Sequence, residues 1–164
     1  MSYKIIVGVD GTEHSTRALR WAVDEARLRD GAITAVFAWQ LPLVGVPGAF
    51  EREEIEREAK AVITHQLAAI VPNGEQPVEV EALVAEGAPS ASLIAACEQL
   101  DADLLVLGSH GHQSVGGLLL GSVGQQCAAY APCPVMIVKE KRSSRERAPE
   151  PAQAQAEAQT EAQT

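Results

Sequence analysis

Short apolar runs alternate along the chain with segments in which apolar residues recur at helical spacing. Continuous apolar or β-branched runs, typical of strands buried on both faces, lie at 3–9, 32–39, 104–107 and 135–138. Helical spacing occupies 12–28, 51–70, 89–100 and 122–130. In the second of these helices, Ile55, Ala59, Val62 and Leu67 are predicted to share the buried face. A fifth run, 77–84, alternates apolar and polar residues, which predicts a half-solvated strand near a sheet edge.

The order of these elements predicts the fold class. Five strand signals and four helix signals alternate strictly, and strands buried on both faces are joined by crossover helices. We therefore expect one doubly wound, parallel α/β sheet formed by residues 1–138. Residues 41–49 carry two prolines and two glycines and predict a loop. Residues 139–164 contain no branched apolar side chain and no aromatic, which predicts a disordered, low-complexity C-terminal tail.

Composition narrows the classes of function. The chain has 164 residues, the length of one domain, and a formal charge of −9 that lies entirely within residues 1–138. An acidic domain with two residues each of Phe, Tyr and Trp is a poor nucleic-acid binder. No apolar run approaches the roughly 20 residues that cross a bilayer, and the first run is too short for a signal peptide, so we expect a cytoplasmic protein without membrane contact. The three cysteines form no CxxC pair and are expected to be reduced and packed as small apolar side chains.

The densest chemical signal follows the fourth predicted strand, in the sequence GSHGHQSVGGLLLGSVG of residues 108–124. Ligands of open α/β sheets bind beyond the carboxyl ends of the strands. Gly108 and Gly111 suit a sharp turn or the close approach of a ligand. Gly121 and Ser122 open the next helix, whose N–H groups can hold phosphate, and Ser122 can either cap that helix or donate to a phosphate oxygen. Glycines that serve packing alone give the same spacing, so nucleotide binding and packing both remain open here.

Asp10 follows the first predicted strand and has two possible roles. A carboxylate at this place in an α/β sheet can accept hydrogen bonds from ribose hydroxyls. Asp10 also lies just before the first predicted helix, where a carboxylate can cap the helix. The residue alone does not separate the two.

These segments together resemble the universal stress protein family. The spacing Gly108-x2-Gly111-x9-Gly121-Ser122 is similar to that family's nucleotide-binding motif, and the opening KIIVGVDGTEHSTRALRWA resembles its first strand, Asp-bearing loop and first helix. The segments VAEGAPSASLIAACEQLDADLLVLGSHG and APCPVMIV resemble its later parts, so the likeness covers about residues 3–138. It implies a flavodoxin-like, adenine nucleotide alpha hydrolase-like sheet with the strand order 3-2-1-4-5.

The resemblance also implies a site. Adenine and ribose would lie near Val9, Asp10 and Ala38. The phosphates would lie against the glycine-rich segment and the start of the last helix, at Gly108, His110, Gly111, Gly121, Ser122 and Val123. Two positions depart from the family pattern: His110 stands where an Arg is common, and Gly124 stands where a second Ser is common. Both changes reduce the number of groups that can hold phosphate.

The function implied is that of an ATP-binding regulator of the stress response, and two alternatives stay beside it. One is a dimeric interaction module that binds no nucleotide, since the last strand, Val135–Val138, would be an apolar edge that a second copy can cover. The other is a slow ATP hydrolase. The sequence has no P-loop and no convergent pair of acids, so we assign no catalytic residue. His110 and His112 are a weak metal signal, and we expect Mg²⁺ only as a companion of the nucleotide. His14 and His65 are predicted to face solvent.

Overall fold

The computed structural model describes residues 2–40, 52–70, 78–110 and 120–139. The elements follow one another in the expected alternation: β1 (Tyr3–Gly8), α1 (Glu13–Arg29), β2 (Gly31–Trp39), α2 (Arg52–Ile70), β3 (Val80–Glu86), α3 (Pro89–Leu100), β4 (Leu104–Gly108), α4 (Ser122–Tyr130) and β5 (Val135–Val138). The predicted loop at 41–49 and the tail beyond residue 139 lie outside the described residues. No helix in the described ranges combines the length and apolarity that a bilayer crossing requires.

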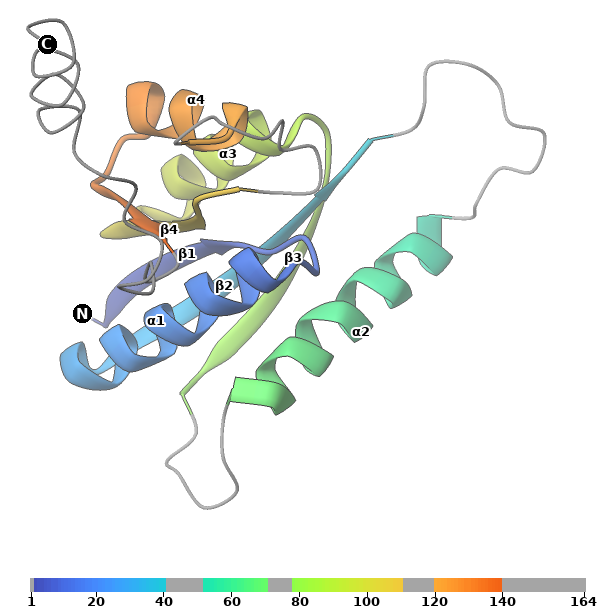
Figure 1. Cartoon of the computed structure of the whole chain (residues 1–164), viewed down its shortest axis with the longest axis horizontal. Coiled ribbons are helices and arrows are strands. Elements are labelled where there is room, and N and C mark those ends of the chain that lie inside the picture. Colours follow the sequence, from blue (N-terminus) through green and yellow to red (C-terminus); the bar gives the residue numbers. More distant parts are fainter. Residues whose placement is uncertain (1, 41–51, 71–77, 111–119, 140–164) are drawn as a thin grey trace, which may run out of the picture.

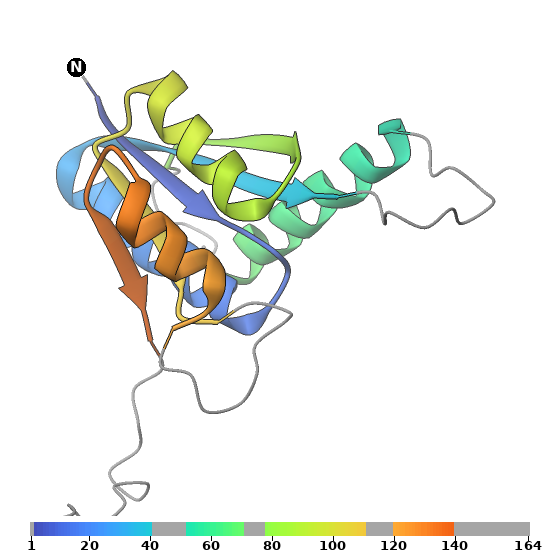
Figure 2. The same cartoon turned by 90° about the horizontal axis from the view of Figure 1, so that it is seen from above.

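The strands form one parallel sheet in the order β3-β2-β1-β4-β5, which confirms both the predicted fold class and the order implied by the resemblance. β1 is central, with β2 on one side and β4 on the other. Figure 1 shows α3 and α4 on one face of the sheet and α1 and α2 on the other. The view from above in Figure 2 shows the same two layers of helices around the sheet.

Alternation along the central strands builds the two halves of the core. Ile5 and Val7 of β1 belong to the cluster on the α1 and α2 face, whereas Ile6 between them belongs to the cluster on the α3 and α4 face. Because successive side chains of a strand point to opposite faces, one apolar run supplies both clusters. All three side chains are at most 1% exposed, which accounts for the uninterrupted apolar character of β1.

The two outer strands differ from the central ones. No residue of β3 is fully buried, in agreement with the half-solvated edge predicted from its alternating pattern. Val80 and Ala82 pack on the α1 and α2 face, and Leu83 packs on the opposite face. β5 forms the other edge, where Met136 is 38% exposed.

The cysteines pack as small apolar side chains, as the sequence predicts, and they lie in the α3 and α4 layer. Cys97 and Cys127 are fully buried, Cys133 is half-buried beside them, and all three thiols are free. Burial raises the pKa of the Cys97 thiol to about 12, with a smaller contribution from the neighbouring Cys133, and raises the pKa of Cys127 to about 11. Both thiols are therefore protonated at neutral pH and serve as core side chains.

We expect the buried thiols to be unreactive in the folded protein. At pH 8, Cys97 and Cys127 should react with an aromatic disulfide reagent at least about a hundredfold more slowly than in guanidinium, because the thiolate is the attacking species and each unit of raised pKa lowers its population tenfold. The release of the coloured thiol, followed by absorbance, measures the rate. The half-buried Cys133 should react first. Rapid native-state modification of all three thiols would contradict this burial.

Candidate functional site

The carboxyl ends of β1 and β4 lie side by side at the centre of the sheet. Val7 is paired with Val106 in the parallel register, so the turns that follow Gly8 and Gly108 leave the same edge of the sheet together. The chain winds from β1 through β2 to β3 on one side and then returns to place β4 and β5 on the other. This reversal of winding is the position where α/β sheets commonly bind ligands.

The turn after β1 is held by a chain of hydrogen bonds. Asp10 Oδ1 accepts bonds from the Thr12 amide at 3.0 Å and from the Thr12 hydroxyl at 2.6 Å. Thr12 in turn caps α1, because its Oγ1 accepts from the Ser15 amide at 3.2 Å. Gly11 between them has a φ of +82°, a left-handed conformation that favours glycine. The capping alternative for Asp10 is therefore wrong: Thr12 is the cap, and the Asp10 carboxylate is oriented by it.

Ser109 joins the end of β4 to the start of α4. Its amide donates to Val138 O at 3.1 Å, and its carbonyl accepts from the Gly121 amide at 3.0 Å. Its hydroxyl lies 3.0 Å from His110 Nδ1, and the residue is only 4% exposed. The sequence prediction passed over Ser109, although a polar residue directly after a buried strand was an available signal. Its three contacts place the first turn of α4 beside the end of the central strands.

α4 begins without a side-chain cap. Gly121 is its N-cap residue, so the capping role considered for Ser122 is wrong, and Ser122 is the exposed first residue of the helix. A Cβ on Gly121 would lie 3.7 Å from Ser109 O and 3.8 Å from His110 Cα, which is ordinary contact. Val123 packs in the α3 and α4 cluster, so only its backbone can face a ligand at this helix start. An uncapped first turn leaves backbone N–H groups suited to an anion.

Three of the glycines examined in the sequence have different environments. A Cβ on Gly108 would lie 2.8 Å from both C and O of His14, so the close packing of α1 requires glycine there. A Cβ on Gly124 would lie 2.6 Å from Leu120 Cδ1, the end of a flexible side chain that can move aside. Gly121 has room for a side chain. Gly111 lies outside the described residues.

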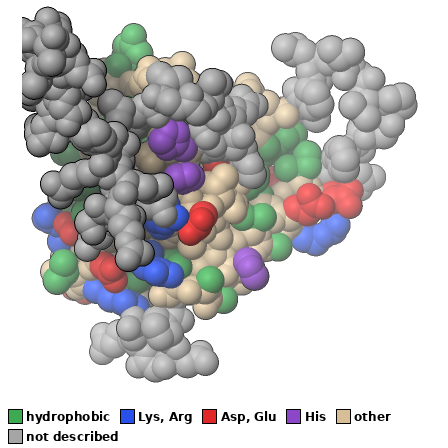
Figure 3. Space-filling view, viewed as in Figure 1, with side chains coloured by type: hydrophobic (Ala, Val, Ile, Leu, Met, Phe, Trp, Pro, Cys, Tyr) green, Lys and Arg blue, Asp and Glu red, His purple; other side chains and the backbone are tan. Residues whose placement is uncertain are grey.

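Two histidines meet at the same place. The rings of His14 and His110 lie with their centroids 5.4 Å apart and their planes at 53°. Figure 3 shows two histidine side chains side by side on this face of the molecule. His14 is half-buried, and its Nδ1 is buried with no hydrogen-bond partner among the described residues. The prediction that His14 faces solvent was wrong, whereas His65 is exposed as expected.

The two residues expected near adenine, Val9 and Ala38, lie at the ends of β1 and β2. Val9 is 4% exposed and its amide donates to Val36 O at 2.9 Å, so its side chain belongs to the core. Ala38 is half-buried near the end of β2, opposite Ala85 of β3. Val9 and the end of β2 are thus joined directly, close to the Asp10 turn.

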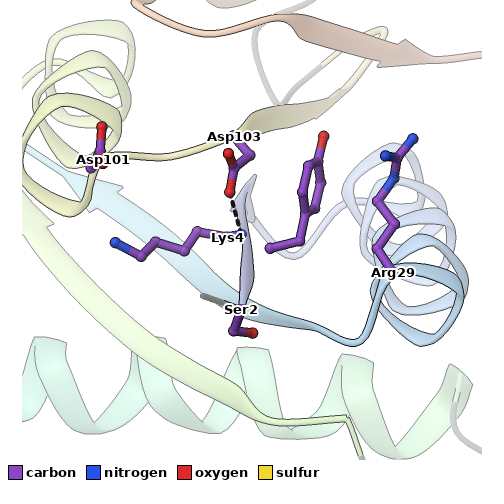
Figure 4. Close-up of a pocket in the computed structure, with 6 residues that line it drawn as sticks. Ser2, Lys4, Arg29, Asp101 and Asp103 are labelled. Atoms are coloured by element: carbon purple, nitrogen blue, oxygen red, sulfur yellow. Dashed lines mark hydrogen bonds between the residues drawn. The ribbon is translucent and has the colours of Figure 1, made fainter.

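A cavity of about 430 Å³ lies at the other end of the sheet, lined by Ser2, Tyr3, Lys4, Arg29, Asp101 and Asp103. Its charged groups are largely engaged with the protein (Figure 4). The Lys4 amide donates to Asp103 Oδ2 at 2.8 Å, and Lys4 Nζ donates to Leu100 O at 2.9 Å. The Arg29 guanidinium lies 4.6 Å from the centroid of the Tyr3 ring. This cavity is at the amino ends of the strands and contains none of the predicted site residues.

The chemistry available at the carboxyl ends of β1 and β4 is that of a binding site. Asp10 supplies an oriented carboxylate, α4 supplies backbone donors, and His14 and His110 supply imidazoles. Within the described ranges, no three His, Cys, Asp or Glu side chains are grouped so that they could hold a metal ion. The arrangement suits a ligand that carries both hydroxyl groups and an anionic group.

Comparison with known proteins places this chain in one family. The profile described as "Universal stress protein family" matches residues 1–139. A universal stress protein of Thermus aquaticus is 34% identical over 137 residues, which cover 82% of this chain and 97% of that protein. The solved structure of the Archaeoglobus fulgidus universal stress protein in complex with dAMP is 27% identical, with a TM-score of 0.61 and coverage of 84% of this chain and 98% of that one. A universal stress protein solved in complex with cAMP is 26% identical, with a TM-score of 0.60 and coverage of 85% and 98%.

Proposed function

The chain belongs to the universal stress protein family, and on that basis we propose that it is an ATP-binding regulatory protein of the stress response. The observation that carries the proposal is that an uncapped helix start, α4, and the oriented carboxylate of Asp10 lie at the same edge of the sheet, where its winding reverses. Relatives in complex with dAMP and with cAMP support an adenine nucleotide as the ligand class.

We place the nucleoside at the ends of β1 and β2. The Asp10 carboxylate accepts from ribose hydroxyls, since a carboxylate has about four lone-pair sites. Adenine lies near Val9 and Ala38. The phosphates lie toward the segment after β4 and the start of α4, in contact with Gly108, His110, Gly111, Gly121, Ser122 and Val123.

The phosphates are held mainly by backbone donors. The chain carries a formal charge of −9, and His110 replaces an arginine that would bring a permanent charge. The N–H groups and dipole of α4 supply the positive potential in this proposal. Mg²⁺ enters with ATP and binds the phosphate oxygens, as is usual for this ion.

We also propose that the protein is a homodimer formed along β5. This strand is an edge of the sheet, and its Met136 is 38% exposed. An apolar edge strand offers unpaired backbone groups that a second copy can cover. The dimer and the nucleotide site use different parts of the molecule and can coexist. Free, buried thiols fit the reducing cytoplasm as its setting.

Thermal unfolding with nucleotides tests the main proposal. ATP at about 100 times its Kd should raise the free energy of unfolding by about 2.7 kcal/mol. For a protein of this size that gain corresponds to a rise in Tm of roughly 5–11 °C. ADP and AMP should act more weakly, because fewer phosphates reach α4, and GTP serves as the control for the base. If no adenine nucleotide at millimolar concentration changes Tm, the proposal is refuted.

A further inference from the structure

α2 contacts the turn after β1 through a buried amide. Gln66 is 5% exposed, although its neighbours on the buried stripe of α2 are apolar. Its Nε2 lies within hydrogen-bonding distance of three acceptors at the start of α1, namely Thr12 O at 3.1 Å, Ser15 Oγ at 3.2 Å and Thr16 Oγ1 at 2.5 Å, which share its two N–H groups. One side chain of α2 therefore binds the cap of another helix, more than 50 residues away in the sequence.

The nitrogen of the Gln66 amide faces these acceptors. Thr12 O is a carbonyl, which accepts from this nitrogen. The opposite atom, Oε1, is buried and has no hydrogen-bond partner among the described residues. A buried acceptor without a donor is unfavourable, so the benefit of glutamine at this position comes from its nitrogen.

Two short paths lead from Gln66 to Asp10. On the first, Thr12 accepts from Gln66 through its carbonyl and donates to Asp10 Oδ1 through its amide and hydroxyl. On the second, Ser15 Oγ accepts both from Gln66 Nε2 and from the Asp10 amide, the latter at 3.4 Å. Gln66 is thus linked by hydrogen bonds, through Thr12 and Ser15, to both the carboxylate and the backbone amide of Asp10. Val62, one turn earlier on α2, lies 3.3 Å from the position of a Cβ on Gly11, so α2 also packs on this turn.

We propose that Gln66 is a positioning residue for sugar recognition: it holds Thr12 and Ser15 so that the Asp10 carboxylate is presented to the ribose hydroxyls of the nucleotide. The inference rests on the proposed function, which it deepens by assigning the control of sugar specificity to a residue outside the ligand's reach. Gln66 then affects the binding of ligands with ribose hydroxyls and leaves the binding of ligands without them unchanged.

Gln66→Met tests this role. Methionine has a similar length and removes both the donor and the unpartnered acceptor, so Tm without ligand should change by only a few degrees. Isothermal titration calorimetry with ATP and with 2′,3′-dideoxy-ATP compares the two ligands. We expect wild type to bind ATP about tenfold or more tightly than the dideoxy analogue. In Gln66→Met the affinity for ATP should fall about tenfold, and the affinity for the analogue should change less than twofold.

The controls separate positioning from stability. Thr64→Ala removes an exposed hydroxyl on the same helix, which bonds only to Lys60 O in the described contacts, and should leave both affinities unchanged. Gln66→Leu has a similar volume and cannot donate to Thr12 O, and it should repeat the selective loss if the methionine variant does not fold. An unchanged preference for ATP, or an equal loss for both ligands, overturns the inference and leaves the proposed function standing. Failure of the wild type to bind either ligand overturns the proposed function and this inference with it.

Discussion

Gly121→Val is expected to abolish nucleotide binding while the fold persists. The backbone at Gly121 has a φ of −66°, which any residue adopts, and a Cβ there would lie 3.7 Å from the nearest atom. The cap position uses no side chain, so the start of α4 loses no hydrogen bond. The branched side chain would occupy the space in front of the first-turn N–H groups, where we place the phosphates. Steric exclusion and loss of the donors then act together.

Calorimetric titration measures the affinity for ATP, and thermal unfolding measures whether the fold persists. Affinity should fall more than about a hundredfold, which removes the ligand-dependent rise in Tm, and Tm without ligand should stay within about 3 °C of wild type. Gly121→Ala is the matched control: its single methyl group fits, and its loss of affinity should be smaller. A valine variant that binds ATP as tightly as wild type would show that the phosphates do not lie at α4.

The succession of strands and helices could be predicted from the sequence because it follows from the pattern of buried apolar side chains. The run 104–107 is apolar since both faces of β4 are covered, and the observed strand, Leu104–Gly108, differs by one residue. The alternating run 77–84 predicted an edge, and β3 is one. The spatial order of the strands was implied by the resemblance, because alternation alone allows more than one order.

The contacts that shape the site could not be predicted from the sequence, because they join segments that lie far apart along the chain. Of the four residues predicted on the buried face of the second helix, Ala59 is buried and the other three are half-buried. Ile63 and Gln66, which were not predicted there, are buried. A glutamine in a helical pattern is usually a solvent-facing residue, and only the three acceptors on α1 make its burial favourable. Half-buried His14 and buried Ser109 were missed for the same reason.

In the glycine-rich segment, spacing alone does not distinguish a glycine required by packing from a glycine that leaves room for a ligand. Gly108 and Gly121 both belong to the spaced motif, yet the first is required by α1 packing and the second has open space for a side chain. The sequence left packing and ligand approach as alternatives for the whole segment. Packing accounts for glycine at 108, whereas packing does not require glycine at 121, where ligand approach stays a prediction.

Gly108→Ala is therefore expected to destabilise the fold itself. Its Cβ would lie 2.8 Å from C and O of His14, and backbone atoms cannot rotate away as a flexible side chain does. The first turn of α1 has to move, and this turn carries the Thr12 cap that orients Asp10. Overpacking of this kind costs about 1–3 kcal/mol. Urea unfolding followed by circular dichroism should show that loss in Gly108→Ala and a change of less than about 0.5 kcal/mol in Gly121→Ala. Equal stability of the two variants would mean that α1 adjusts to the methyl group without cost, and ligand approach would then again be open as the reason for glycine at 108.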